Sequence, residues 1–447
     1  MSEGRSTSAA TLGWFSRTAG RLSVILLLFG CDGSQDRQES TGDPPTTGRA
    51  DSEPERLEFF GAIVDPGPDF ATGPARSEAE REGSKLSEDL GRLPAPLLLK
   101  AGNDPVRSVA FSPDGELVAA GDGWNEGFAY RGKLYLWETR SGKLIGKHEG
   151  FRRPVERISF SDSGKIVAAS PRFGGPVIVW QVGQEDRKAT LRTSAYVLGL
   201  TAETEVLVAM EGFGGEKDEA PRLGVARWRL DTSPKPEDVV IHDVGLVMGL
   251  SANKQVLFGY YPDGRDGRVV FWSTGDWKQL GEINVGEGDS HAISDDGRLF
   301  AVRVDVSGDG ITTLDLFDVR EQKLLRRCRY RDVLCNMVFH SSGEVLAENY
   351  YDDLFLRDLK TGHFFATWSP RKVKEGPNRF TSRFTMSSLA FSRDGDALAA
   401  GLFNTNEVAL FRIAQSDLKR LRDASKTSQQ EEGVDTEKRN SRDGAKD

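Results

Sequence analysis

Hydrophobic and polar residues alternate in a pattern that repeats along the middle of the chain. An apolar stretch that ends in Phe-Ser or a close variant, followed by a turn, occurs seven times. Its marker residues are Phe111, Phe160, Leu200, Leu250, Ile293, Phe339 and Phe391. A second apolar run follows each one, as in LYLW, and its last residues are Trp137, Trp180, Trp228, Trp272, Phe317, Arg357 and Phe411. Two series in the same order indicate seven copies of one unit.

Each unit contains four stretches with the period of two that is typical of β-strands. In the first unit these are VRSVAF, ELVAA, KLYLW and KLIGK, with turn residues between them. Four-stranded units that recur every roughly 40 to 50 residues are typical of propeller blades. We therefore predict an all-β fold, a seven-bladed β-propeller of four-stranded antiparallel blades, over residues 94–414.

The seventh unit lacks a fourth strand, because VALFRI at 408–413 is followed by a polar segment. The stretch APLLLK at 95–100 precedes the first unit and belongs to no other. We expect this N-terminal strand to complete the last blade and close the ring, because closure protects the edges of the sheets.

The N-terminal segment has the pattern of an export signal. The run LSVILLLF at 22–29 follows several arginines and is much shorter than the about 20 residues of a membrane-spanning helix. The residues LFGC at 28–31 resemble a bacterial lipobox, in which the cysteine is lipidated. We expect a signal peptide at 1–30, lipidation of Cys31, and an exported lipoprotein anchored on the periplasmic or cell-surface side of a membrane. An ordinary secretory signal is the alternative.

Two flanking segments contain few apolar residues. Residues 31–93 and 415–447 are rich in charged and small polar residues, with one apolar cluster at 57–64. Such segments bury too little apolar area to offset the entropy lost on ordering. We interpret 31–93 as a disordered linker to the anchor and 415–447 as a disordered tail with at most one short helix, around Leu418 to Leu421.

The units resemble the WD-repeat β-propeller family. VRSVAFSPDGELVAAG with GKLYLWETRSGKLI, and VERISFSDSGKIVAAS with PVIVWQV, follow the family pattern most closely. The Asp after the Trp position occurs only as Asp318 and Asp358, and the expected Gly-His pair occurs in no unit. The resemblance therefore implies a side-chain network that is incomplete in every blade. It implies no particular partner, since propellers host unrelated functions.

The aromatic markers of the second series fall on the third strand of their blades. We interpret them as core residues between sheets, each ring burying about 150–250 Å², and not as a stacking platform for bases or sugars. These residues are Trp137, Trp180, Trp228, Trp272, Phe317 and Phe411.

Composition and motifs argue against several functions. The 59 Lys and Arg against 68 Asp and Glu give a formal charge of -9, which disfavours nucleic acid as a partner. The five histidines lie apart without ligand spacing, and no nucleophile elbow, P-loop or dinucleotide motif occurs. We predict no catalytic residues, no metal and no cofactor. Cys328 and Cys335 are expected on the outer strand of blade five and the inner strand of blade six, too far apart for a disulfide.

Long loops between the second and third strands would lie on one rim, beside the connections between blades. They are rich in aromatic residues, which are typical of protein-binding faces when loops stand on a rigid scaffold. The alternative is that the rings pack under their own loops. A basic connection at 369–383 opens on the same rim. The candidate partner-binding residues are Trp124, Phe128, Tyr130, Phe213, Tyr260, Tyr261, Tyr350, Tyr351 and Phe403.

These observations favour a non-catalytic scaffold that binds a protein or peptide and is tethered to a membrane outside the cytoplasm. A carbohydrate-binding propeller that uses the rim aromatics is the main alternative. A propeller enzyme has less support, because no cluster of carboxylates and histidines converges on the expected channel mouth.

Overall fold

The computed structural model places most residues of the repeat region. It describes residues 63–64, 90–123, 131–171, 175–191, 195–211, 223–231, 238–241, 245–263, 266–286, 288–305, 312–330, 334–350, 353–369 and 386–424. All of them belong to the second of two units, Met1–Ala62 and Ile63–Asp447. The predictions for Cys31, Trp124, Phe128, Tyr130, Phe213 and Tyr351 lie outside the described residues.

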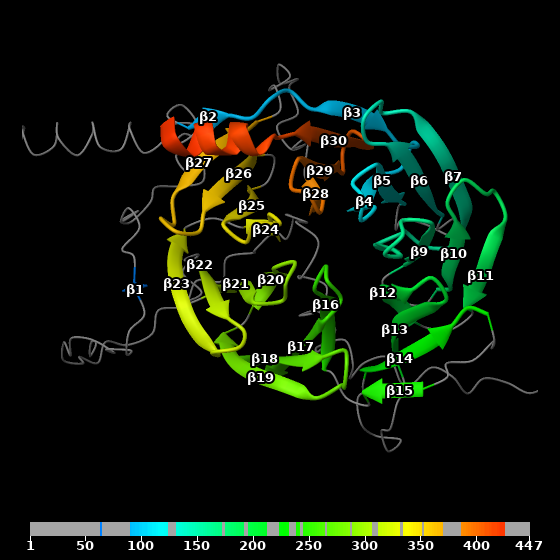
Figure 1. Ribbon diagram of the computed structural model, residues 1–447, viewed down its shortest axis with the longest axis horizontal. Helices are drawn as coiled ribbons and strands as arrows, with labels where there is room; N and C mark the ends of the chain where they lie inside the picture. Colours follow the sequence, from blue (N-terminus) through cyan, green and yellow to red (C-terminus); the bar gives the residue numbers. More distant parts are fainter. Residues whose placement is uncertain are drawn as a thin grey trace, which may run out of the picture. The chain divides into compact units, whose positions relative to one another are not determined.

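Seven four-stranded antiparallel blades form a ring, which confirms the predicted fold class (Figure 1). In blades one to six the strands follow the order of the chain from the inside of the ring outward. Blades one to three comprise β4 (Val106–Phe111), β5 (Leu117–Asp122), β6 (Gly132–Glu138) and β7 (Leu144–Phe151); β8 (Arg157–Phe160), β9 (Ile166–Ser170), β10 (Val177–Gln181) and β11 (Arg187–Leu191); and β12 (Ala195–Ala202), β13 (Glu205–Glu211), β14 (Leu223–Arg229) and β15 (Asp238–Ile241).

The remaining blades repeat this arrangement. Blades four to seven comprise β16 (Leu246–Leu250), β17 (Val256–Asp263), β18 (Asp266–Ser273) and β19 (Gln279–Gly286); β20 (Gly288–Ile293), β21 (Leu299–Asp305), β22 (Thr312–Asp318) and β23 (Lys323–Tyr330); β24 (Leu334–Phe339), β25 (Val345–Tyr350), β26 (Asp353–Asp358) and β27 (Phe364–Trp368); and β28 (Met386–Phe391), β29 (Ala397–Leu402) and β30 (Glu407–Arg412). Cys328 lies on the outer strand of blade five and Cys335 on the inner strand of blade six, where the sequence placed them.

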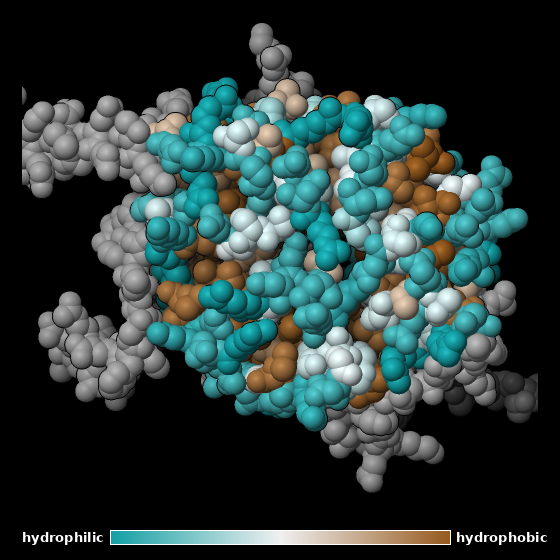
Figure 2. Space-filling model, in the orientation of Figure 1, coloured by the Kyte–Doolittle hydropathy of each residue, from teal (hydrophilic) through white to brown (hydrophobic). Residues whose placement is uncertain are grey.

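The apolar surfaces of the blades face one another. The second strands β9 and β29 are buried along their whole length, because each blade is covered by a neighbour on both faces. The outer strand β19 instead alternates between buried and exposed residues along its second half. Hydrophilic residues gather over the centre of the ring face in Figure 2, as expected when apolar area is buried between blades.

The ring is closed by a strand from the N-terminal side. β3 (Leu97–Lys100) pairs antiparallel with β30, with Leu97 opposite Leu410 and Lys100 opposite Glu407. β3 leads directly into blade one, so blade seven is built from both ends of the repeat region. This confirms the prediction that an N-terminal strand supplies the fourth strand of the last blade.

The aromatic residues of the third strands lie in the core. Their side chains are between 0% and 7% exposed and belong to the apolar clusters between neighbouring sheets. They therefore serve as packing residues of the frame. These side chains are Trp137, Trp180, Trp228, Trp272, Phe317 and Phe411.

Parts of the predicted linker pair with outer strands. β1 (Ile63–Val64) runs parallel to β23, with Ile63 opposite Arg326. β2 (Gly91–Arg92) runs parallel to β27, and the following Leu93 is buried. These two segments are therefore paired strands, whereas disorder was predicted for 31–93. The outer strands β23 and β27 have unpaired backbone groups with which an extended segment can form hydrogen bonds.

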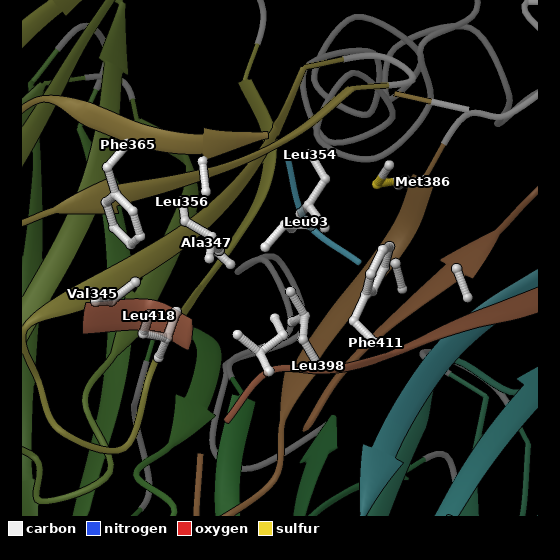
Figure 3. Packing of buried hydrophobic residues seen from close by; sticks show 14 of the residues in the cluster. Leu93, Val345, Ala347, Leu354, Leu356, Phe365, Met386, Leu398, Phe411 and Leu418 are labelled. Carbon is white, nitrogen blue, oxygen red and sulfur yellow. The ribbon is translucent and has the colours of Figure 1, made fainter. Parts of the chain in front are cut away.

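The C-terminal tail begins with a helix over residues 415–424, at the position around Leu418 to Leu421 where the sequence allowed one short helix. Leu418 and Leu421 are three residues apart and so lie on one side of the helix. Figure 3 shows Leu418 in one cluster with Leu93, Val345 and Leu398, at the seam between blades six and seven. Arg422 adds ion pairs to Asp358 at 2.7 Å and to Glu344 at 2.8 Å. The apolar contacts of Leu418 and Leu421 and the ion pairs of Arg422 therefore attach the start of this segment to the propeller.

Candidate functional site

Neighbouring strands run in opposite directions, so the connections of each blade fall on two faces. The "loop rim" carries the loops between second and third strands and the connections between blades. The "turn face" carries the turns between first and second strands and between third and fourth strands. The predicted partner-binding residues belong to the loop rim. Of these, the structure describes Tyr260, Tyr261 and Phe403, and the backbone of Tyr350 at the end of β25.

Tyr260 is a core residue and not an accessible rim residue, which corrects the prediction for this position. The predicted loop 260–267 is the end of the hairpin β17–β18, in which Tyr260 pairs with Val269 and Asp263 with Asp266. Tyr260 is 6% exposed, in the cluster between blades four and five. A Cβ atom at Gly267 would lie 2.3 Å from the ring, so the glycine makes room for it.

Tyr261 and Phe403 are half-buried at the loop rim, each beneath an arginine. The guanidinium carbon of Arg268 lies 4.6 Å from the ring centre of Tyr261. The guanidinium carbon of Arg107 lies 4.5 Å from the ring centre of Phe403. Both are cation–π arrangements, which fix a ring while leaving part of it accessible. Arg107 and Phe403 come from opposite ends of the repeat region, so no local pattern predicts their contact.

Phe403 stands at the seam between blades seven and one. The Arg107 side chain above its ring is held by a hydrogen bond from Nε to the carbonyl oxygen of Gly123, at 3.0 Å. Asn406 Nδ2 donates to the carbonyl oxygen of Asn103 at 2.9 Å, and the Ala101 N–H donates to the carbonyl oxygen of Asn406 at 3.1 Å. The closing strand and the last loop are therefore joined at the rim.

A buried carboxyl group lies beneath the same seam. Asp122 accepts a hydrogen bond from the Lys133 N–H at 2.7 Å and from the Tyr135 hydroxyl at 3.0 Å. Burial raises the pKa of Asp122 to about 6, and the nearby Asp104 carboxylate adds to the rise. Burial and the Asp122 charge also raise the pKa of Tyr135. This pair fixes the rim end of blade one and makes its stability sensitive to pH.

The turn face is built from one repeated hydrogen-bonded turn. In blade one the Ser112 hydroxyl donates to Asp114 at 2.5 Å, and the Leu117 N–H donates back to the Ser112 hydroxyl at 2.9 Å. The same pairing joins Ser294 to Asp296 and Ser392 to Asp394. These carboxylates thus stabilise turns. Within the described part of the chain, no group of three or more His, Cys, Asp or Glu side chains could hold a metal ion.

Two of the histidines, His148 and His340, are buried within the propeller frame. His148 stacks on Trp180 with ring centres 4.7 Å apart, and burial lowers its pKa. His340 replaces the serine of the repeated turn in blade six, where Nδ1 lies 2.9 Å from the Ser342 hydroxyl. Burial also lowers the pKa of His340. Both rings therefore favour the neutral form and pack within the frame.

The fold defines a seven-bladed β-propeller, and a comparison with protein families refines this class. The family model "WD domain, G-beta repeat" matches residues 96–138. In the structure this segment is the closing strand β3 followed by β4, β5 and β6. The match and the seven-bladed ring together support a WD-repeat β-propeller. A search of the curated proteins found no match.

Proposed function

We propose that the protein is a non-catalytic scaffold that binds a protein or peptide at the loop rim. The observation that carries this proposal is the WD40 repeat within a closed seven-bladed ring. Propellers of this kind typically serve as protein-interaction scaffolds, because the blades hold many loops in fixed positions on one face.

The accessible aromatic residues support the loop rim as the binding face. Tyr261 and Phe403 are each held by an arginine. Tyr, Phe and Arg are enriched in protein interfaces. A ring that is fixed before binding loses little conformational entropy when a partner covers it. The rim thus offers pre-organised anchors above a rigid frame.

The partner is first identified by chemical crosslinking in the cells that produce the protein, followed by mass spectrometry. The purified partner is then titrated against the full chain and against the double variant Tyr261→Ala with Phe403→Ala. We expect about a thirtyfold or larger loss of affinity, equivalent to about 2 kcal/mol. Because Tyr261 also packs against the buried cluster of blades three and four, the melting temperature is recorded in parallel and affinity is measured well below it.

Leu144→Ala is the matched control. This leucine is also a large apolar residue, 47% exposed, but it lies on the outer strand of blade one. Affinity should not change in this variant. Unchanged affinity in the double variant, or an equal loss in the control, would place the binding site elsewhere.

The proposal includes attachment to a membrane through a lipid on Cys31, with the propeller outside the cytoplasm. Its support is the arginine-rich start of the chain, the apolar run at 22–29 and the LFGC motif. Among the described residues, no helix is both long and apolar enough to cross a membrane. Cys31→Ser should abolish acyl labelling and release the protein into the soluble fraction. Full membrane retention without a label would contradict this part.

A further inference from the structure

A cavity of about 260 Å³ opens on the turn face between blades two, three and four. Its lining includes Asp162 from blade two, Glu205 and Arg227 from blade three, and Lys254 and Trp277 from blade four. It lies on the opposite face from the predicted partner-binding residues and has no part in the proposed function.

Lys254 occupies a position where five of the other six blades have glycine. It stands four residues after the first marker of its unit and has a φ of 61°. A side chain is disfavoured in this left-handed conformation because Cβ approaches the neighbouring carbonyl oxygen. The equivalent residues with positive φ in the other blades are Gly115, Gly164, Gly297, Gly343 and Gly395. The turn itself therefore has no need of a lysine.

Trp277 repeats this exception in the other turn of the same blade. It stands five residues after the second marker, with a φ of 58°, where blades one and six have Gly142 and Gly362. Blade five has Gln322 at this position, but its side chain lies against Gly281 and does not line the cavity. Two bulky residues in an unfavourable conformation thus meet at one cavity. Such backbone strain clusters at functional sites.

Hydrogen bonds hold both turns of blade four in place. The Lys254 N–H donates to the carbonyl oxygen of Ser251 at 2.8 Å. The Thr274 hydroxyl donates to the carbonyl oxygen of Lys254 at 2.6 Å, and the Thr274 N–H to that of Gln255 at 3.0 Å. The left-handed backbone is therefore fixed from both sides, and the two side chains reach the cavity in set positions.

The short turn of blade three makes space for the cavity. Only two residues separate β12 from β13, whereas five separate β16 from β17 in blade four. Lys254 reaches across blade three, and its Nζ lies 2.7 Å from Asp162 Oδ1 and 3.3 Å from the carbonyl oxygen of Phe160. This bridge joins blades two and four along one wall of the cavity.

The lining favours a neutral, hydroxyl-rich ligand. The carboxylates of Asp162 and Glu205 balance the cations of Arg227 and Lys254, so an ion gains little net attraction. A sugar hydroxyl can donate to the carboxylates and accept from the cations, while the C–H face of a sugar ring can pack on Trp277. The volume falls just below the roughly 300–1,000 Å³ of drug-sized pockets. We propose that this cavity binds a single sugar residue of a glycan.

The test uses purified full-length protein and the methyl glycosides of glucose, galactose, mannose and N-acetylglucosamine, observed by saturation-transfer NMR and titrated for affinity. At least one glycoside should bind. Trp277→Ala and Asp162→Asn should each weaken that binding tenfold or more. Lys254→Gly should do the same with an unchanged or higher melting temperature, since glycine suits its turn. Gln322→Gly, the matched change in blade five, should leave binding unaltered.

The proposal is overturned if none of the four glycosides binds, or if binding is equal in the cavity variants and the wild type. Displacement of the bound glycoside by acetate or by arginine amide, at concentrations at which the other glycosides do not displace it, would also overturn the proposal. The site would then recognise charge. Partner binding at the loop rim should be the same in all these variants, so failure here is distinct from failure of the proposed function.

Discussion

Blades two and six fill the same position of the third strand with opposite chemistry. Blade two has Trp180, 1% exposed, whose ring packs on His148 and Phe151 of the preceding blade. Blade six has Arg357, 4% exposed, whose Nε lies 2.6 Å from Glu348 Oε1. The frame thus requires this position to be filled and any polar atoms there to be hydrogen-bonded. It does not require the residue to be apolar.

The two solutions stabilise the fold in different ways. Trp180 contributes through apolar area and close packing. Arg357 contributes little net energy through its ion pair, because desolvation of both charges offsets their attraction. Its guanidinium also lies 3.9 Å from the ring centre of Phe364. This contact replaces part of the packing that a tryptophan ring provides in blade two. Disrupting either arrangement should lower the free energy of unfolding, but for a different physical reason in each blade.

The largest expected effect is that of Trp180→Ala. Removal of a fully buried indole leaves a cavity between blades one and two, and should lower the free energy of unfolding by about 3–5 kcal/mol. Urea unfolding monitored by circular dichroism measures the change. A loss below about 1 kcal/mol would mean that this position carries no core function in blade two.

Arg357→Ala should have a similar effect, about 3–5 kcal/mol, because Glu348 would remain buried without its guanidinium. The control is the double variant Arg357→Met with Glu348→Leu, which removes both charges and keeps much of the volume. It should unfold at the same urea concentration as the wild type or a higher one. If the double variant were as unstable as Arg357→Ala, the ion pair itself, and not only the filling of the position, would stabilise blade six.

Asp122 is a buried carboxyl without the guanidinium partner that Glu348 has, and it accepts hydrogen bonds from the Lys133 amide and the Tyr135 hydroxyl. Its pKa of about 6 lies above the ordinary value near 3.9, so the folded state binds more protons between these values. Its contribution to stability is complete below about pH 4 and is lost as the pH rises through 6. Asp122→Asn removes this dependence. Relative to the wild type, the variant should gain up to about 3 kcal/mol between pH 4 and pH 7.

Urea unfolding at pH 4, 5, 6 and 7 measures this gain. Both proteins share every other titrating group, so the difference between them isolates Asp122. A difference in unfolding free energy that stays constant over this range would show that Asp122 titrates normally.

The frame could be predicted from the sequence because local patterns encode it. The markers placed Trp180 and even Arg357 on third strands, and counting strands in the last unit revealed that 95–100 must close the ring. These predictions were possible because each unit can be compared with the other copies in the chain.

The remaining features depend on partners far apart in the chain. The stacking of Arg107 on Phe403 and the packing of Leu418 with Leu93 leave no local pattern. Tyr260 was misplaced because the PDG sequence that follows it resembles a loop, whereas β17 continues to Asp263 and Gly267, opposite Pro262, leaves room for the Tyr260 ring. The site was therefore only partly predictable, since tertiary contacts decide which aromatic residues stay accessible.

Recognition of a protein at the loop rim can be tested in the cell by site-specific photo-crosslinking. A photoreactive amino acid replaces Asn404, exposed on the loop rim, or Glu116, exposed on the turn face, in the full-length protein within the cells that produce it. A discrete protein adduct is expected from position 404 and none from position 116. An adduct only from position 116, or from neither position, would contradict it.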